Sequence, residues 1–350
     1  MVAAIRCLFV MLVLVPLAAA PANATRPGPA VHSLQSAVDW INDYRRTRDL
    51  AHAPLAIRAL SYYGGLKDPE SSGTYVGFIA GLLGANPDKA GELIDRMLPV
   101  RPEDQWAIVR GIAYSGLPNW KALLRDHAGK LEGRQAMIAD YLNGKLPTLA
   151  MLTIKPGPTT YQRMREAFAI NWPGAEKPKK PVALEPNQEV LDTLWGYYLA
   201  TGSYGPVLRV VDLLPWAKDR DNVDRLTVGS MAKYTLATNA SRDADLLAKL
   251  KAIRSARSQT KEITTQLEQV IHAAEIADAG ALRKDALAAI EQLKLKGPAY
   301  KRDMNAWAMV GQGALAVGCV TAAALGQFEF GLPCVIGGGA TSAAMYYMHD

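Results

Sequence analysis

Residues 83–90 read Leu-Gly-Ala-Asn-Pro-Asp-Lys-Ala and separate two stretches in which apolar residues follow a helical spacing. The stretch before them, 72–83, is almost entirely apolar, and the stretch after them, 90–97, repeats apolar residues every three or four positions. Such a repeat forms one face of an α-helix. Because glycine and proline are typical of the corner between two helices, this part of the chain predicts a helical hairpin.

The same pattern continues on both sides, and no run of alternating β-branched residues interrupts it. The apolar spacing predicts further helices over 31–46, 54–63, 102–116, 118–131, 134–142, 161–168, 188–201, 206–214, 221–238, 242–257, 261–279 and 281–296. The sequence therefore predicts an all-α fold of stacked helical hairpins, either α-solenoid-like or an irregular helical domain, with an apolar helical hairpin at its carboxyl end.

Composition divides the chain into five predicted segments. Residues 1–24 have a basic start, a short apolar core and an Ala-Asn-Ala end, which is the pattern of a secretory signal peptide. Helical regions are predicted over 25–144 and 188–297, and residues 145–187 between them are rich in proline, as a linker or wrapping segment would be. Residues 303–350 form the apolar tail. The sequence thus predicts an exported protein of Gram-negative type, periplasmic or attached to the envelope.

Charge and composition exclude some classes of protein. Apolar residues make up 49% and charged residues 21% of the chain, so a buried core is expected rather than a disordered chain. The net charge of +6 is spread along the sequence and does not interleave with aromatic residues. Together with export, this excludes nucleic acid as an expected partner.

Three corners share a glycine, at 83–90, 115–120 and 201–207. The third resembles the corner of a tetratricopeptide repeat, through Gly202, Tyr204, Val207, Val211 and Pro215. The resemblance implies helix pairs stacked into a superhelix that binds segments of other proteins. The spacing of the corners departs from a regular period, so an irregular helical domain with common Gly/Pro corners remains the alternative.

One candidate catalytic pair stands out. Ser230 and Lys233 have the S-x-x-K spacing of penicillin-binding enzymes, in which a lysine one helical turn further on deprotonates the serine. The pattern is unspecific, because Ser258 and Lys261 match it as well and the partner motifs S-D-N and K-T-G do not occur. A small residue on a packed helix is the competing interpretation of Ser230.

The tail carries two further patterns. Small residues recur at every fourth position, at Ala314, Gly318, Ala322 and Gly326, which lets two helices approach closely. Cys319 and Cys334 could form a disulfide, because they are an even pair in a compartment where disulfides persist. A helical hairpin would oppose this bond, since it would place the two cysteines too far apart along its length. Residues 304–348 could span or contact a membrane, pack into a core, or join copies of the chain.

No set of residues indicates a cofactor or a metal site. His272, Glu275 and Glu268 share one side of a predicted helix but are too few to be a zinc site with a clear ligand set. Tryptophans and tyrosines, including Tyr62 and Tyr63, are expected in the core. The leading hypothesis is an exported, non-enzymatic helical scaffold that binds another protein. The alternatives are a membrane-perturbing protein that acts through its tail, and an envelope serine hydrolase.

Overall fold

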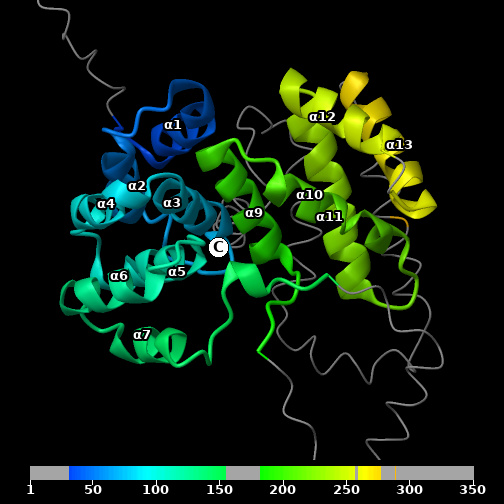
Figure 1. The fold of residues 1–350 in the computed structure, drawn as a ribbon. Coiled ribbons are helices and arrows are strands. Elements are labelled where there is room, and N and C mark those ends of the chain that lie inside the picture. Colours follow the sequence, from blue (N-terminus) through cyan, green and yellow to red (C-terminus); the bar gives the residue numbers. More distant parts are fainter. Residues whose placement is uncertain (1–30, 155–181, 257–258, 277–287, 289–350) are drawn as a thin grey trace, which may run out of the picture. The chain divides into compact units, whose positions relative to one another are not determined.

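The computed structural model describes residues 31–154, 182–256, 259–276 and 288 (Figure 1). The predicted segments 1–24, 161–168, 281–296 (apart from residue 288) and 303–350 lie outside these residues. Within the described ranges the fold is all-α, as predicted, and its only β-type pairing is an isolated parallel bridge between Leu152 and Leu184. The first group of helices is α1 (Leu34–Thr47), α2 (Ala53–Tyr62), α3 (Gly73–Ala85), α4 (Ala90–Met97), α5 (Gln105–Tyr114), α6 (Trp120–His127) and α7 (Gln135–Leu142).

The second group follows the proline-rich segment. Its helices are α9 (Gln188–Thr201), α10 (Gly205–Val211), α11 (Val223–Ala240), α12 (Ala244–Ser255) and α13 (Lys261–Glu275). Short 3-10 turns connect several helices, namely η1 (Pro87–Lys89), η2 (Pro102–Asp104), η3 (Ala128–Lys130), η4 (Leu149–Met151) and η5 (Leu214–Lys218). Of the helices that the structure describes, none is long and apolar enough to cross a bilayer.

Polar side chains fix where several helices begin. Asn187 accepts a hydrogen bond from the Val190 amide at the start of α9, over 2.8 Å, and Asp243 does the same for Leu246 at the start of α12, over 3.0 Å. Ser33 and Ser36 cap α1 reciprocally. Each cap satisfies an amide that has no partner inside the helix. Helix α9 starts at the predicted residue, whereas α1 and α12 start three and two residues later than predicted, directly after their capping residues Ser33 and Asp243.

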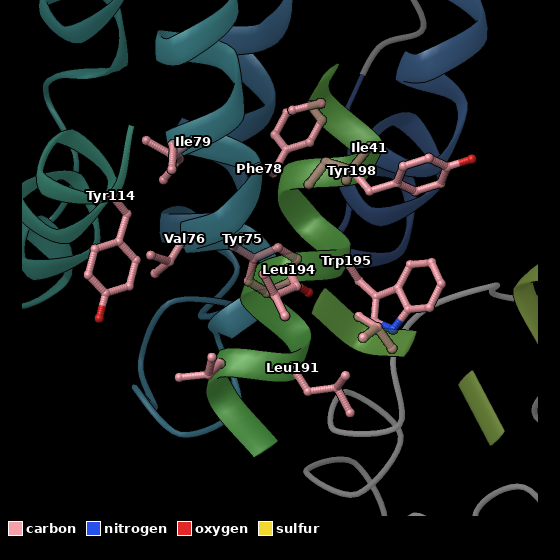
Figure 2. Packing of buried hydrophobic residues seen from close by; sticks show 14 of the residues in the cluster. Ile41, Tyr75, Val76, Phe78, Ile79, Tyr114, Leu191, Leu194, Trp195 and Tyr198 are labelled. Carbon is pink, nitrogen blue, oxygen red and sulfur yellow. The ribbon is translucent and has the colours of Figure 1, made fainter. Parts of the chain in front are cut away.

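Helix α3 lies at the centre of the core. Eleven of its residues, Gly73 to Leu83, are buried, so it has no polar face and must be covered on all sides. It packs against α5, α4 and, most extensively, α9. Figure 2 shows side chains of α3, among them Tyr75 and Phe78, beside Leu194, Trp195 and Tyr198 of α9.

Glycines bring α3 and α9 into backbone contact. Gly73, Gly77 and Gly81 recur at every fourth position of α3 and face α9, where Gly196 faces back. A β-carbon on Gly77 would lie 2.7 Å from the carbonyl carbon of Thr193, and one on Gly196 would lie 2.8 Å from the amide nitrogen of Phe78. Small residues at this spacing permit such an approach. The first and second groups of helices therefore share one core.

The three glycine corners found in the sequence have two different causes. Gly116 and Gly202 adopt positive φ angles of 74° and 69°, which ordinary side chains rarely do. Gly84 lies within α3, where a β-carbon would come within 2.7 Å of the Tyr197 hydroxyl. Sequence neighbours such as α1 and α2, or α9 and α10, do pack together, but α3 and α9 are far apart in the chain. Whether the corners belong to a repeat stays a prediction.

The second group has its own close contact. Gly229 of α11 packs against the backbone of η5, so that a β-carbon would lie 2.7 Å from Cβ of Trp216. The guanidinium of Arg225 stacks 4.3 Å from the Trp216 ring centroid. The indole of Trp195 donates to the hydroxyl of Thr235 over 3.0 Å, which fixes α9 against α11.

Candidate functional sites

The catalytic pair suggested by the sequence is placed on α11. Ser230 is half-buried, and Lys233 lies one turn further on, also half-buried. The ammonium group of Lys233 donates to the side-chain oxygen of Gln269 on α13, so it links these two helices. The serine hydrolase hypothesis stays a prediction. The small-residue stripe Ala314, Gly318, Ala322 and Gly326 and the cysteines Cys319 and Cys334 lie outside the described residues.

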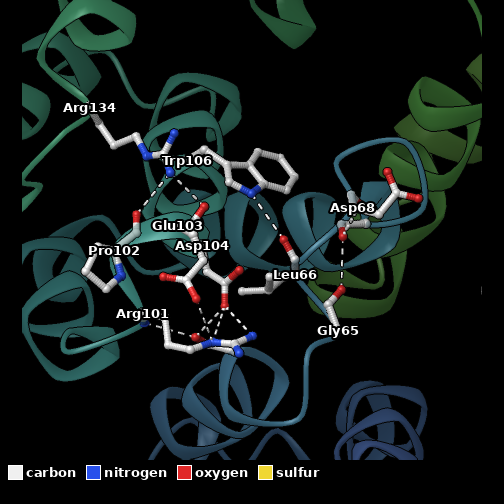
Figure 3. Close-up of polar contacts among 11 residues, drawn as sticks. Gly65, Leu66, Asp68, Arg101, Pro102, Glu103, Asp104, Trp106 and Arg134 are labelled. Atoms are coloured by element: carbon white, nitrogen blue, oxygen red, sulfur yellow. Dashed lines mark hydrogen bonds and ion pairs between the residues drawn. The ribbon is translucent and has the colours of Figure 1, made fainter.

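Two aspartates of the described ranges are fully buried, and their surroundings differ. The first, Asp104, precedes α5 and accepts a hydrogen bond from the Ser61 hydroxyl over 2.7 Å and one from Arg101 Nε over 3.1 Å (Figure 3). Nearby, the indole of Trp106 donates to the carbonyl of Leu66 over 3.1 Å. These contacts tie α2 to the start of α5, and they use the carboxylate as a structural partner.

The second buried aspartate, Asp192, has no such partners. Its side chain lies in the α3–α9 interface, where its β-carbon is 2.9 Å from the position that a β-carbon on Gly73 would take. Neither carboxyl oxygen has a hydrogen-bond partner among the described residues, and the same holds for the hydroxyl of Tyr75 on α3. Burial, and secondarily the charge of Glu189, raise the pKa of Asp192 well above its usual value. An uncompensated buried carboxyl group is rare.

Glu189 lies one turn before Asp192 on α9 and pairs with Arg110 of α5. Burial raises the pKa of Glu189, and the guanidinium of Arg110 opposes that rise. Burial alone would lower the pKa of Arg110, but Glu189 and the buried tyrosines Tyr141 and Tyr114 raise it overall. Arg110 also stacks on Trp106, 5.0 Å from the ring centroid. This ion pair joins α5 to α9.

A third polar group joins α1, α9 and α12. Asp243 accepts from Arg45 of α1 over 2.5 Å and from the hydroxyl of Tyr198 of α9 over 2.8 Å. Arg48 follows α1 with a positive φ of 52° and donates to the carbonyls of Ala200 and Thr201, which end α9. These polar groups hold helices from both halves of the chain together.

The outer face of α2 has exposed apolar side chains, although Tyr62 and Tyr63 were expected in the core. Leu55 and Tyr62 are two turns apart and are 48% and 77% exposed, and Tyr63 is 38% exposed. The rings of Tyr62 and Tyr63 lie edge to face, 5.0 Å apart. Arg58 is exposed between Leu55 and Tyr62 on the same face. We call Leu55, Arg58, Tyr62 and Tyr63 the α2 stripe. The sequence could have indicated this exposure, because these residues do not share the helical face of the buried Ile57 and Leu60.

Most other aromatic residues behave as expected. Trp40, Trp106, Trp195, Trp216 and Tyr198 are buried, whereas Trp120 and Tyr197 are half-buried. Within the described ranges, no group of three or more His, Cys, Asp or Glu side chains could hold a metal ion. Glu275, which the sequence pairs with His272, forms an ion pair with Lys251 over 2.7 Å.

The chain was compared with models of protein families, with curated proteins and with solved structures, and none of the three comparisons gave a match.

Proposed function

We propose that this chain is an exported, non-enzymatic helical scaffold that binds another protein through the α2 stripe. The observation that carries the proposal is the exposure of Tyr62, 77% of whose surface is open to solvent beside Leu55 and Tyr63. Tyrosine and arginine are the residues that most often dominate the free energy of protein–protein binding. Leu55, Arg58 and Tyr62 follow the i, i+3, i+7 spacing along one face by which one helix recognises another.

The charge of the stripe indicates the kind of partner. Arg58 and the nearby Lys67 are exposed and have no ion pair with any residue that the structure describes. Arg58 stands in the middle of the stripe, so a symmetric pairing of two copies would bring two guanidinium groups together. We therefore commit to a different protein as the occupant: an amphipathic segment with aliphatic side chains and a carboxylate that faces Arg58.

The proposed location is the periplasm or the envelope, and it rests on the composition of residues 1–24 and 304–348. Residues 1–24 would direct export to the periplasm or envelope, and residues 304–348 would attach the scaffold to a membrane or join copies of it. In this arrangement the helices would form the exposed working part. We propose neither a cofactor nor a nucleic-acid partner for the protein.

The test is capture of partners from an envelope extract by the full-length protein, compared with Leu55→Ser/Tyr62→Ser. The matched control is Leu208→Ser, which removes a leucine that is 41% exposed on α10. We expect the stripe variant to lose one specific partner, by about 30-fold or more in affinity if Tyr62 is a major contributor to binding. The control should keep it, and Arg58→Glu should weaken binding to the acidic segment. Equal capture by all variants would refute the role of the stripe.

A further inference from the structure

Asp192 is a carboxyl group that lacks a polar partner inside the close backbone contact between α3 and α9. Its side chain is 0% exposed, and both oxygens lack a hydrogen-bond partner among the described residues. The helices around it touch through backbone atoms at Gly73 and Gly77 of α3 and at Gly196 of α9. Such a contact leaves little room for the water that an ionised carboxylate needs.

The groups that face Asp192 do not favour a negative charge. Glu189 acts on it from the same face of α9, and its own charge is already shared with Arg110 of α5. On α3, the nearby titratable group is the hydroxyl of Tyr75, which is buried and has no hydrogen-bond partner among the described residues. The loop carboxylates Asp68 and Glu70 act on Glu189 and add further negative charge.

We propose that Asp192 is a proton-binding site: the folded chain holds this carboxyl group in its neutral form, and loss of the proton loosens the contact between α3 and α9. This inference goes beyond partner binding and does not depend on the α2 stripe. Asp104, which is equally buried, differs from Asp192 because Ser61 and Arg101 both donate to its Oδ2 atom. Nothing comparable contacts Asp192 among the described residues.

The sign of the pH effect follows from proton linkage. Burial raises the pKa of Asp192 in the folded chain, so between the pKa of the unfolded chain, about 4, and that of the folded chain, the folded state binds more protons. The stability that the neutral group permits is fully present below that lower pKa. It is lost as the pH rises, and the equilibrium constant of unfolding increases by up to about tenfold for each pH unit.

The experiment is urea unfolding of the full-length protein from pH 4 to pH 9, for wild type, Asp192→Asn and Asp104→Asn. Asparagine has the shape of a neutral aspartic acid but cannot ionise. We expect wild type and Asp192→Asn to have similar stability near pH 4, and the unfolding constant of wild type to exceed that of the variant at least about tenfold by pH 7. Hydrogen exchange should place the alkaline loosening in α3 and α9.

Two outcomes would overturn the proposal. One is parallel pH profiles of wild type and Asp192→Asn. The other is an Asp192→Asn variant that is less stable than wild type at neutral pH. That result is expected instead for Asp104→Asn, because the change weakens the ion pair between residue 104 and Arg101. Should Asp192→Asn not fold, carbon-13 NMR of the wild-type carboxyl group decides: the chemical shift of a neutral acid at pH 7 supports the proposal, and that of a carboxylate refutes it.

Discussion

Gly77 of α3 and Thr193 of α9 are in backbone contact: a β-carbon on Gly77 would lie 2.9 Å from Cα of Thr193 and 2.7 Å from its carbonyl carbon. This contact joins a helix from before the proline-rich segment to one from after it. The side of α3 that contacts α9 can therefore be covered only when the two halves of the chain come together.

The first prediction concerns that contact. Gly77→Ala adds a methyl group where rigid backbone atoms lie, so α3 and α9 must separate, at a cost of about 3 kcal/mol or more in unfolding free energy. Gly91→Ala is the matched control, because Gly91 is also helical and its β-carbon would have nothing nearer than 3.9 Å. That control should be neutral or gain about 0.5–1 kcal/mol from better helix propensity. Chemical denaturation measures both, and a Gly77→Ala variant as stable as Gly91→Ala would contradict the backbone contact.

The second prediction concerns Asp243, which caps α12 and binds Arg45 and Tyr198. Asp243→Ala removes all three contacts and leaves a partly buried guanidinium without its carboxylate. We expect a loss of about 3 kcal/mol in unfolding free energy. Asp245→Ala, two residues further on and exposed, is the control and should change stability by less than about 0.5 kcal/mol. Equal effects of the two changes would argue against the three-helix link.

Arg48 gives a third prediction, on backbone strain. Its φ of 52° is the one positive value at a non-glycine residue in the part of the chain described, and its guanidinium binds the end of α9. Arg48→Ala loses the hydrogen bonds and keeps the strain, whereas Arg48→Gly loses both. The glycine variant should therefore be the more stable of the two by about 1 kcal/mol in thermal or chemical unfolding. The reverse order would show that the left-handed conformation is not strained.

The fourth prediction concerns pH and the pair of Arg110 with Glu189. Burial raises the pKa of Glu189, so the stability contributed by this group falls as the pH rises above the unfolded value of about 4.3. Arg110 limits that fall. In Arg110→Met the pKa of Glu189 should rise further, and the loss of stability should be small at pH 4 and about 2 kcal/mol at pH 7. The same loss at both pH values, measured by denaturant unfolding, would exclude this coupling.

Much of the helical structure could be predicted because local signals determine it. The boundaries of α9, 188–201, agree with the prediction to the residue, since Asn187 caps its start and Gly202 ends it. The predicted corners at Gly116 and Gly202 are confirmed by their positive φ angles. These features depend on residues close together in the sequence, so they can be predicted from the sequence alone.

The packing partners could not be predicted in the same way. The spacing of Gly73, Gly77 and Gly81 in α3 indicates that another helix approaches closely. It does not identify α9 as that helix. The isolation of Asp192 depends on which residues α3 brings beside it, and those are far away in the sequence. The exposure of Tyr62 was missed because aromatic residues were expected in the core.

Site-specific photocross-linking in cells tests the proposed binding of an acidic amphipathic segment of another protein to the α2 stripe. A photoreactive amino acid would replace Tyr62 in the full-length chain, and Leu208 in the control. We expect one discrete adduct from position 62, mapped to a segment of another protein with aliphatic residues and a carboxylate, and no such adduct from position 208. An adduct with residues 304–348 or with a second copy of the chain, or the same adducts from both positions, would contradict it.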